Sequence, residues 1–551
     1  MTELTQSVGL EREGEIALIV IDNPPVNALS HHVRQGILDG VEAARADDEV
    51  TAIVLTCRGR TFIAGADISE FGKAPQGPGL GEVQAAMESS PKPVVAAIHG
   101  NALGGGFEVA MCANYRVAVA GTNFGFPEVK LGLLPGAGGT QRLPRVVGAA
   151  KALDMVVGGD PIDAAEALEL GLIDDLVDRD EAGTAEAGAI AFARRCVAEG
   201  MPLKKLRDLD DKVSADRANP EIFDQYRQKI ARKTRGFLAP EYNIRCIEAA
   251  VNLDDFDAGI ERERELFTEL MSGTQSAAQR YYFFAEREAA KIPDVPRDTP
   301  QLSIESAGIL GAGTMGGGIA MNFANAGIPV TVVERDQESL DRGLGVVRKN
   351  YERSASRGSI PAEAVEERMA LITGSVDRQD FAEADIVIEA VFEDMDLKKE
   401  VFADLDRIAK PDALLASNTS ALDVNVIASA TTRPESVIGM HFFSPANVMK
   451  LLEVVRGDAT SDQIIATTMA LSKRITKIPV LSGVCHGFIG NRMLAKRRIE
   501  SDRLILEGAT PAQVDKVVYD FGFPMGPYAM SDLAGLDEVE VSAFQPMSRP
   551  A

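Results

Sequence analysis

The chain has 551 residues, 45% of them hydrophobic, and a formal net charge of -25 at pH 7. The length predicts three or four domains at roughly 150 residues each. The negative charge argues against nucleic acid and anionic membrane surfaces as general partners, because both are bound by basic surfaces. No apolar stretch approaches the ~18 to 20 residues that span a bilayer. We therefore expect no nucleic-acid partner and no integral membrane segment.

The five cysteines are scattered and include no C-x-x-C pair, so neither a disulfide framework nor a metal site is expected. The first ten residues lack the basic start and apolar core of a secretory signal, and Ser548 to Ala551 is not a peroxisomal address. We expect a bacterial cytoplasmic protein. A peroxisome remains the alternative if the true C-terminus is missing.

Three consecutive glycines, Gly104 to Gly106, stand just before a predicted helix from Phe107 to Cys112. Backbone N–H groups at a helix start face outward with the helix dipole behind them, which suits a developing oxyanion. The glycine turn from Ala64 to Ile68 follows a predicted strand and could supply a second donor. Together the two turns predict an oxyanion hole. The strands predicted in this region are Ile16 to Ile21, Ala52 to Thr56 and Val94 to Ile98.

Glu108 and Glu128 follow these glycine turns and form a candidate carboxylate pair. Two carboxylates at one site can share acid and base work on the same substrate. The alternative from the residues alone is that both are surface glutamates among the many acids of this chain.

The middle of the chain has a different composition. From about Ala182 to Lys291 the pattern is helical and highly charged, and Ile292 to Pro300 holds three prolines in a short polar stretch that reads as a linker. We predict four parts: residues 1–181, a helical region over 182–300, a dinucleotide unit over 301–480, and a helical part over 481–551.

Gly311, Gly313 and Gly316 match the G-x-G-x-x-G pattern of dinucleotide-binding proteins. Ser306 to Leu310 reads as a buried strand that enters the glycine turn, and Gly317 to Ala326 has helical spacing. In such a turn the N–H groups at the helix start hold a pyrophosphate, and the glycines allow its close approach. The alternative is a tightly packed glycine turn in some other α/β unit.

A second predicted strand, Pro329 to Val333, ends at Glu334. An acid at this distance from the glycine turn meets the adenosine ribose. Its charge would repel a 2′-phosphate, so the sequence predicts NAD rather than NADP as the cofactor.

Polar residues end two further predicted strands, Ala384 to Val391 and Leu414 to Ser420, and ligands gather at the carboxyl ends of strands in a doubly wound sheet. His441 is one of only five histidines and could take a hydroxyl proton while a hydride leaves the same carbon. Glu453 could orient its ring. The alternative is a structural histidine in an apolar setting.

The first 180 residues resemble the enoyl-CoA hydratase (crotonase) family. The resemblance implies a crotonase-type ββα spiral in which the N–H groups of Ala66 and Gly105 polarise a thioester carbonyl. It implies that Glu108 and Glu128 hold a water that adds to C3, with Glu128 delivering the proton to C2. Because both glutamates are present we expect hydration, with enoyl-CoA isomerisation left open as a further activity. The matching motifs are Asn23 to Leu29, Phe62 to Ile68, Gly104 to Glu108 and Phe126 to Gly136.

Residues after 300 resemble the NAD-dependent (3S)-3-hydroxyacyl-CoA dehydrogenase family, which implies a Rossmann domain and a helical domain. By this resemblance His441 is the base, Glu453 its partner, and Ser420 and Asn491 hold the substrate oxygen. The matching motifs are Asn418 to Leu422, His441 to Pro445, Met449 to Glu453 and Phe488 to Arg492.

The same family resemblance implies three cofactor contacts. Glu393 and Lys398 match positions near the nicotinamide. Ser444 also matches a cofactor contact, although the family often has asparagine there.

The whole chain is thus similar to fused multifunctional β-oxidation enzymes, and Tyr282 to Arg287 resembles their joining segment. We expect acyl-CoA thioesters as substrates, a thiolase as a candidate partner, and an unassigned oligomeric state. The resemblance ends at about Glu538, so we expect a partial dehydrogenase C-terminal domain. Two alternatives stay open: a hydratase or isomerase whose dehydrogenase half is inactive through truncation, and a scaffold subunit of a β-oxidation complex.

Overall fold

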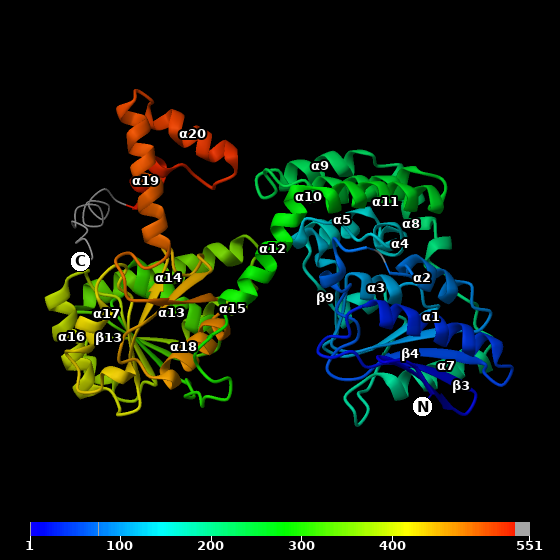
Figure 1. The fold of residues 1–551 in the computed structure, drawn as a ribbon, viewed down its shortest axis with the longest axis horizontal. Helices are drawn as coiled ribbons and strands as arrows, with labels where there is room; N and C mark the ends of the chain where they lie inside the picture. Colours follow the sequence, from blue (N-terminus) through cyan, green and yellow to red (C-terminus); the bar gives the residue numbers. More distant parts are fainter. Residues whose placement is uncertain (1, 75, 535–551) are drawn as a thin grey trace. The chain divides into compact units, whose positions relative to one another are not determined.

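The computed structural model describes residues 2–74 and 76–534, and the departure expected from Glu538 onward lies outside these residues. Backbone contacts divide the chain into two compact units, Met1–Phe283 and Phe284–Ala551. Figure 1 shows each unit as a sheet with helices around it. The predicted α/β fold class is confirmed, and the predicted four-part division stays a prediction.

The first unit is built on a seven-stranded sheet in the order β1-β2-β3-β4-β5-β7-β10. Its first three strands pair antiparallel and the rest pair parallel. The predicted strands are confirmed, with β4 one residue longer than expected. The strands are β1 (Thr2–Thr5), β2 (Val8–Glu13), β3 (Ile16–Ile21), β4 (Ala52–Cys57), β5 (Val94–Ile98), β7 (Tyr115–Val119) and β10 (Asp175–Val177).

Helices cover both faces of this sheet because its central strands are apolar on both sides. In β3, Ile16, Leu18 and Val20 face a cluster that includes α7, whereas Ala17 and Ile19 face the larger core with α1 to α5. The helices are α1 (His31–Ala46), α2 (Leu80–Glu88), α3 (Gly105–Ala110), α4 (Gly139–Val147), α5 (Ala149–Gly158), α6 (Ala164–Glu169) and α7 (Glu186–Ala198).

A second, three-stranded sheet places the predicted glycine turns. Strands β6 (Asn101–Leu103) and β8 (Asn123–Gly125) pair parallel, and β9 (Ile162–Asp163) pairs antiparallel with β8. Helix α3 begins directly after β6, two residues earlier than the sequence predicts. The N–H group of Gly105 therefore lies in its first turn.

The charged region after residue 200 forms a layer of helices on the first unit. Helix α10 packs on α4, α5 and α11, and Figure 1 shows α9 to α11 together above α4 and α5. The helices are α8 (Asp211–Arg217), α9 (Glu221–Ile230), α10 (Ala239–Asn252), α11 (Phe256–Ser272) and α12 (Thr274–Ala289).

The second unit contains an eight-stranded sheet in the order β13-β12-β11-β14-β15-β16-β17-β18. Every neighbouring pair is parallel except β16 with β17. The four predicted buried strands, which are β11, β12, β14 and β15, are confirmed, and each is shorter than expected. The eight strands of the sheet are β11 (Ala307–Leu310), β12 (Val330–Val333), β13 (Ile372–Ser375), β14 (Ile386–Glu389), β15 (Leu414–Ser417), β16 (Val437–Phe442), β17 (Leu451–Arg456) and β18 (Ile478–Gly483).

This sheet is doubly wound, because one core holds α13, α14 and α18 against one face and a second core holds α16 and α17 against the other. The helices are α13 (Thr314–Asn325), α14 (Gln337–Ser356), α15 (Glu363–Met369), α16 (Met395–Ile408), α17 (Val424–Ala428) and α18 (Asp462–Arg474).

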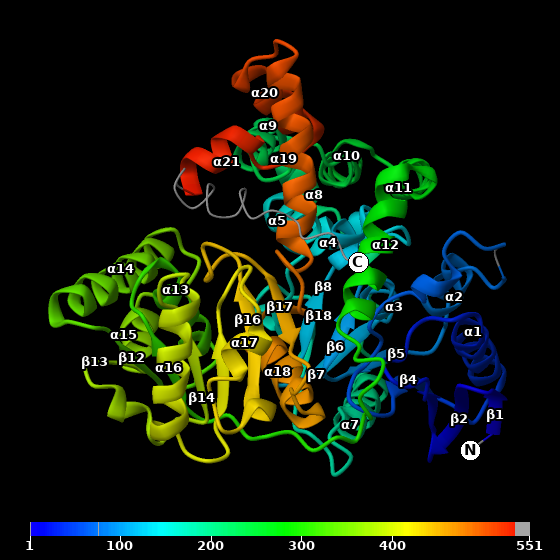
Figure 2. The same ribbon diagram turned by 60° about the vertical axis from the view of Figure 1, so that its left-hand side comes forward.

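A helical segment follows β18. It consists of α19 (Gly490–Leu506), α20 (Pro511–Phe521) and α21 (Pro527–Ala534). Figure 2 shows α19 leading away from the sheet to the other two helices. Across the described part of the chain, every helix is too short or too polar to cross a bilayer.

Candidate active sites

Glu108 and Glu128 come from the ends of two neighbouring parallel strands. Glu108 lies on α3 after β6, and Glu128 lies in a short 3-10 turn, Pro127–Leu131, after β8. Because β6 and β8 pair with Leu103 opposite Gly125, both segments leave the small sheet at the same edge. The topology therefore brings together two acids that are twenty residues apart, as predicted.

Glu108 is buried, with 3% of its surface exposed. Its Oε1 accepts hydrogen bonds of 2.8 Å from the N–H groups of Ala137 and Gly139. Burial raises the pKa of Glu108, while these two N–H groups and the charge of Arg142 act in the opposite direction. The alternative of a solvated surface glutamate does not describe this side chain.

Glu128 has a different environment. Its Oε2 is buried and has no hydrogen-bond partner among the described residues. Burial raises the pKa of Glu128 well above its ordinary value, and the charges of Glu108 and Glu263 raise it further. Gly104 has a φ of +52° and leaves room for this carboxylate, since a Cβ there would lie 2.5 Å from Glu128 Oε1. Glu128 is thus the carboxyl group that holds a proton more readily.

The two predicted oxyanion donors lie beside each other. A Cβ built on Gly105 would lie 3.6 Å from the nitrogen of Ala66. The Leu29 N–H donates to the carbonyl of Gly65, the residue before Ala66. This bond fixes the strand-like segment that contains Ala66. Within the described chain neither the Ala66 nor the Gly105 N–H donates to a protein acceptor. Both donors are therefore available to a substrate oxygen.

A third buried carboxylate, Glu263, was missed by the sequence reasoning. It lies on α11 and is 1% exposed. Its Oε1 accepts a 2.6 Å hydrogen bond from the Gly138 N–H, and its Oε2 accepts one from the Thr140 hydroxyl. Burial, then the charge of Glu108, raises the pKa of Glu263 to about 8. A usable signal was its position on the apolar stripe of its helix, which is otherwise formed by Phe256, Gly259, Leu266 and Leu270.

In the second unit, His441 on β16 and Glu453 on β17 are directly opposite in the antiparallel pair. The two atoms His441 Nδ1 and Glu453 Oε2 are 2.7 Å apart, and both side chains are buried. Glu453 Oε1 accepts from the N–H groups of Ile489 and Gly490. Burial opposes ionisation of Glu453, but the bond from His441 and these N–H groups hold its pKa below the ordinary value.

Asn491 and Ser420 are brought together as the sequence predicts. Asn491 is the second residue of α19, directly after Gly490, and its Nδ2 donates to the Ser420 carbonyl at 3.4 Å. Glu393 Oε1 accepts from the Ser420 N–H at 2.8 Å and from its hydroxyl at 3.2 Å. The start of α19 therefore links the Glu453 side of the site to the polar end of β15.

Lys398 is buried between two carboxylates. Its Nζ lies 2.6 Å from Glu389 and 3.2 Å from Glu393. Although burial opposes its ionisation, the charge of Lys398 and a hydrogen bond from Thr419 lower the pKa of Glu393. Sequence reasoning named Glu393 and Lys398 but missed Glu389. The available signal was an acid at the end of the otherwise apolar strand β14.

The glycine turn fits a dinucleotide. A Cβ on Gly316 would lie 1.9 Å from the Gly311 carbonyl oxygen, whereas one on Gly313 would meet no atom within 4 Å. Helix α13 starts after Gly313 with no side-chain cap among the described residues, so its first N–H groups remain available to a phosphate. Glu334 accepts from the Ala312 N–H at 3.0 Å, which places its carboxylate at the turn.

Ser444 is exposed and lies two residues after the end of β16. The residues just after it lie against α13, because a Cβ on Gly318 would be 3.2 Å from the Ala446 nitrogen and Asn322 donates to the Ala446 carbonyl. Ser444 therefore lies in the segment that joins the histidine strand to the helix of the glycine turn.

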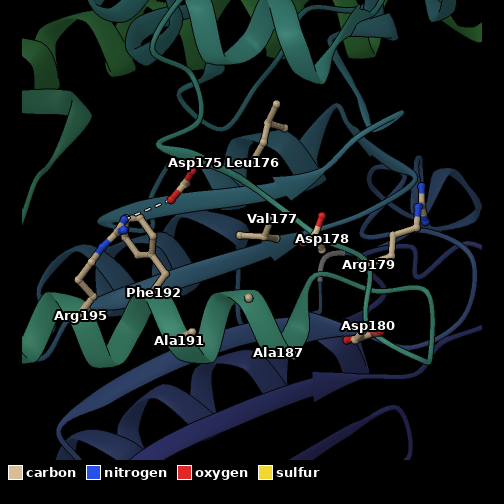
Figure 3. A pocket seen from close by; sticks show the side chains of 11 residues that line it. Asp175, Leu176, Val177, Asp178, Arg179, Asp180, Ala187, Ala191, Phe192 and Arg195 are labelled. Carbon is tan, nitrogen blue, oxygen red and sulfur yellow. Dashed lines mark hydrogen bonds and ion pairs between the residues drawn. The ribbon is translucent and has the colours of Figure 1, made fainter.

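One surface pocket lies apart from these residues. Its volume is about 480 Å³, and it is formed by β10, α7 and the loop between them, as Figure 3 shows. Arg195 and Asp175 pair across its rim at 3.2 Å. None of the predicted site residues lines it. No metal-binding group of acids, histidines or cysteines occurs among the residues that the structure describes.

Three protein families match the chain in succession. Residues 11–222 match "Enoyl-CoA hydratase/isomerase". Residues 306–485 match "3-hydroxyacyl-CoA dehydrogenase, NAD binding domain", and residues 487–545 match "3-hydroxyacyl-CoA dehydrogenase, C-terminal domain". The chain thus joins a hydratase/isomerase domain to an NAD-dependent dehydrogenase, and NAD is its cofactor.

Relatives that match nearly the whole chain are named as bifunctional enzymes or multifunctional proteins. The peroxisomal bifunctional enzyme of Danio rerio is 44% identical over 526 residues, which are 95% of this chain and 71% of that protein. The enzyme of the same name from Homo sapiens is 44% identical over 528 residues, 95% of this chain and 72% of that protein. The peroxisomal fatty acid beta-oxidation multifunctional protein MFP2 of Arabidopsis thaliana is 36% identical over 540 residues, 96% and 74% respectively.

The chain belongs to this family of bifunctional β-oxidation enzymes. The expected fusion of hydratase and dehydrogenase is confirmed. Neither alternative, the inactive dehydrogenase half or the scaffold subunit, is favoured by these matches.

Proposed function

We propose that the chain hydrates a trans-2-enoyl-CoA at Glu108 and Glu128 and oxidises the resulting (3S)-3-hydroxyacyl-CoA at His441. The observation that carries the first half is the buried Glu108 side chain and the buried Oε2 of Glu128 beside two available N–H groups. The observation that carries the second half is the buried His441–Glu453 pair in the unit with the glycine turn. Both halves act on an acyl thioester.

In the hydratase site the two glutamates are suited to different parts of the reaction. Glu108 receives two N–H donors, which favour its carboxylate and let it take a proton from water. The water oxygen bonds to C3, and Glu128, whose pKa is raised well above the ordinary value by burial and by Glu108, gives its proton to C2. Transfer of a proton from Glu108 to Glu128 then restores the pair.

The oxyanion donors determine which bond is polarised. As water adds to C3, negative charge develops on the thioester oxygen. The N–H groups of Ala66 and Gly105 would stabilise that charge, and removing one such donor typically costs about 10² to 10³ in rate. Because both donors are fixed backbone groups, they need little reorganisation during the reaction.

In the dehydrogenase site the histidine is oriented before substrate binds. Its Nδ1 is held by Glu453, which leaves Nε2 to take the proton of the 3-hydroxyl group. Ser420 and Asn491, which lie together, would hold the substrate oxygen. Bound NAD would supply the acceptor for the hydride that leaves C3. Glu453 stabilises the imidazolium that forms, so proton removal and hydride loss leave a 3-keto group.

The proposal is tested by two assays on three proteins. Wild type should hydrate crotonyl-CoA and form NADH from 3-hydroxybutyryl-CoA. Glu128→Gln should lose hydration by about 10² to 10⁴ and keep NADH formation, and His441→Ala should show the reverse. Each variant thereby controls for the other. Full hydration by Glu128→Gln, or full NADH formation by His441→Ala, would refute the corresponding site.

The chemistry and the relatives also suggest a setting for the enzyme. A 3-ketoacyl-CoA product is the substrate of a thiolysis reaction, so a thiolase is the proposed partner. The relatives are named as peroxisomal, and we propose a peroxisome for this chain if its host has that organelle and the cytoplasm otherwise. Gel filtration with and without a thiolase would measure the oligomeric state and test the partner.

A further inference from the structure

The loop that follows Glu128 runs into the first turn of α4, and its last part, Ala137 to Thr140, is held by two carboxylates in alternation. Ala137 and Gly139 donate to Glu108, whereas the residues between and after them, Gly138 and Thr140, donate to Glu263. The Gly138 N–H thus binds one carboxylate, while the N–H groups on either side of it bind the other. The orientation of the N–H groups that donate to Glu108 therefore depends on the hydrogen bonds that Glu263 accepts from the same segment.

Glu263 comes from outside the region that matches the hydratase family. Glu263 lies on α11, beyond the residues 11–222 that match the hydratase family. Two further side chains from the same helical layer hold the preceding part of the loop. Asn243 on α10 donates to the Leu133 carbonyl, and Ser276 on α12 donates to the Leu131 carbonyl. Glu263 is the only one of the three that reaches the segment bonded to Glu108.

We propose that Glu263 is a positioning residue of the hydratase site: by binding the Gly138 N–H and the Thr140 hydroxyl, it holds the loop so that Ala137 and Gly139 both donate to Glu108. This inference rests on the proposed hydratase function. It gives the helical layer after residue 222 a part in hydration, although Glu263 itself does not touch the substrate.

The surroundings of Glu263 are consistent with a role through the loop. The groups that face it are Glu108 from α3, Glu128 from the 3-10 turn, Thr140 and Arg142 from α4, and Cys246 from α10. Arg142 is already paired with buried Glu88 at 2.9 Å, so it is not a dedicated partner of Glu263. The direct hydrogen-bonding partners of Glu263 are both on the loop. Loss of this carboxylate should therefore act first on the loop and then on Glu108.

Glu263→Ala and Glu263→Gln test the proposal in the full chain, with Glu265→Ala as the matched control. Glu265 lies on the same helix with a side chain 63% exposed. We expect Glu263→Ala to lower kcat of crotonyl-CoA hydration about 10- to 100-fold, as for other supporting partners, with KM changed by less than about twofold. Glutamine can still accept from Gly138, so Glu263→Gln should keep at least about a third of kcat.

The pH profile separates positioning from general support of the fold. Without two well-aimed N–H donors Glu108 should ionise at higher pH, so the acidic limb of kcat in Glu263→Ala should move upward. The limb should stay in place in Glu265→Ala. A folded Glu263→Ala protein with wild-type kcat and an unmoved limb would overturn the proposal, as would a loss confined to KM.

A second variant covers the case in which Glu263→Ala does not fold. Thr140→Val keeps the shape of the side chain and removes one of the two bonds from the loop to Glu263. It should lower kcat about threefold to tenfold, because one hydrogen bond to Glu263 is lost while the bond from the Gly138 N–H remains. Unchanged kcat would count against the inference. If wild type itself fails to hydrate crotonyl-CoA, the proposed function fails instead.

Discussion

His441 and Glu453 are direct cross-strand neighbours in the one antiparallel step of the second sheet, with Nδ1 and Oε2 2.7 Å apart. Directly opposite residues in such a pair have their side chains on the same face and close together. The other oxygen of Glu453 is held by the start of α19. The orientation of the histidine is thus set by backbone register and by a helix that follows the sheet.

Glu453→Gln should therefore impair oxidation more than substrate binding. The amide can still accept from the N–H groups of α19, but it stabilises the imidazolium poorly and can hold the wrong tautomer. We expect kcat for NADH formation to fall roughly 100-fold or more, by analogy with carboxylate-to-amide changes beside other basic histidines. Glu435→Gln, an exposed acid before β16, is the control. An unaffected kcat would show that Glu453 does not support His441.

Glu263 should make the first unit less stable as the pH rises. Its pKa is raised to about 8 from an ordinary 4.5, so between these values the folded state holds a proton that the unfolded state has lost. The contribution of Glu263 to the free energy of unfolding is complete below pH 4.5. It declines as the pH rises to about 8, by at most about 1.4 kcal/mol per pH unit.

Glu263→Gln removes this titration and should lose less unfolding free energy than wild type between about pH 5 and about pH 8. Urea unfolding at several pH values, followed by circular dichroism, measures the difference. Glu265→Gln should follow the wild-type curve. If the unfolding free energies of Glu263→Gln and wild type changed in parallel with pH, the pKa of Glu263 would be at its ordinary value.

Glu334 should determine the choice between NAD and NADP. Its carboxylate is fixed at the glycine turn by the Ala312 N–H, where it would repel a 2′-phosphate. Glu334→Ala removes that repulsion and leaves the exposed Arg335 beside the same position. We expect the ratio of kcat/KM for NAD over NADP to fall about tenfold or more. Glu338→Ala, an exposed acid on α14, should leave the ratio as it is.

Lys398 should be needed for the stability of the second unit. Lys398→Met leaves Glu389 buried and without its cation, and it removes a partner of Glu393. Removing one member of a buried ion pair typically costs about 3 to 5 kcal/mol. The double variant Lys398→Met, Glu389→Gln should recover part of this loss in urea unfolding. A double variant as unstable as the sum of the single variants would contradict the coupling.

Much of both sites could be predicted from local sequence. Glycine turns, buried strands and acids at strand ends are short-range patterns, so Glu108, Glu128 and Glu334 were found from their neighbours. His441 and Glu453 are twelve residues apart and needed only the correct strand register to meet. The family resemblance supplied roles that the residues alone left open.

Glu263 could not be found in this way, because its partners Gly138 and Thr140 are 125 and 123 residues away in sequence. It also lies in the charged run Arg262 to Glu265, which resembles a solvated helix face. Its place on the apolar stripe of α11 is the one local signal, and the packing of α11 on the loop shows that Glu263 is buried. Glu389 was missed for the opposite reason: it ends an otherwise apolar strand.

The hydrogen bonds between α10, α11 and α12 and the hydratase loop have a consequence for exchanging domains between related enzymes. A hydratase donated as residues 1–222 would leave behind Asn243, Glu263 and Ser276, and with them the outer support of its own acid/base loop. The shortest segment that contains the complete hydratase site must therefore include these three residues, and it extends into α12. Chimaeras cut before Ser276 should express as hydratases with a loosened loop, whereas those that keep the whole of α12, to Ala289, should transfer the activity whole.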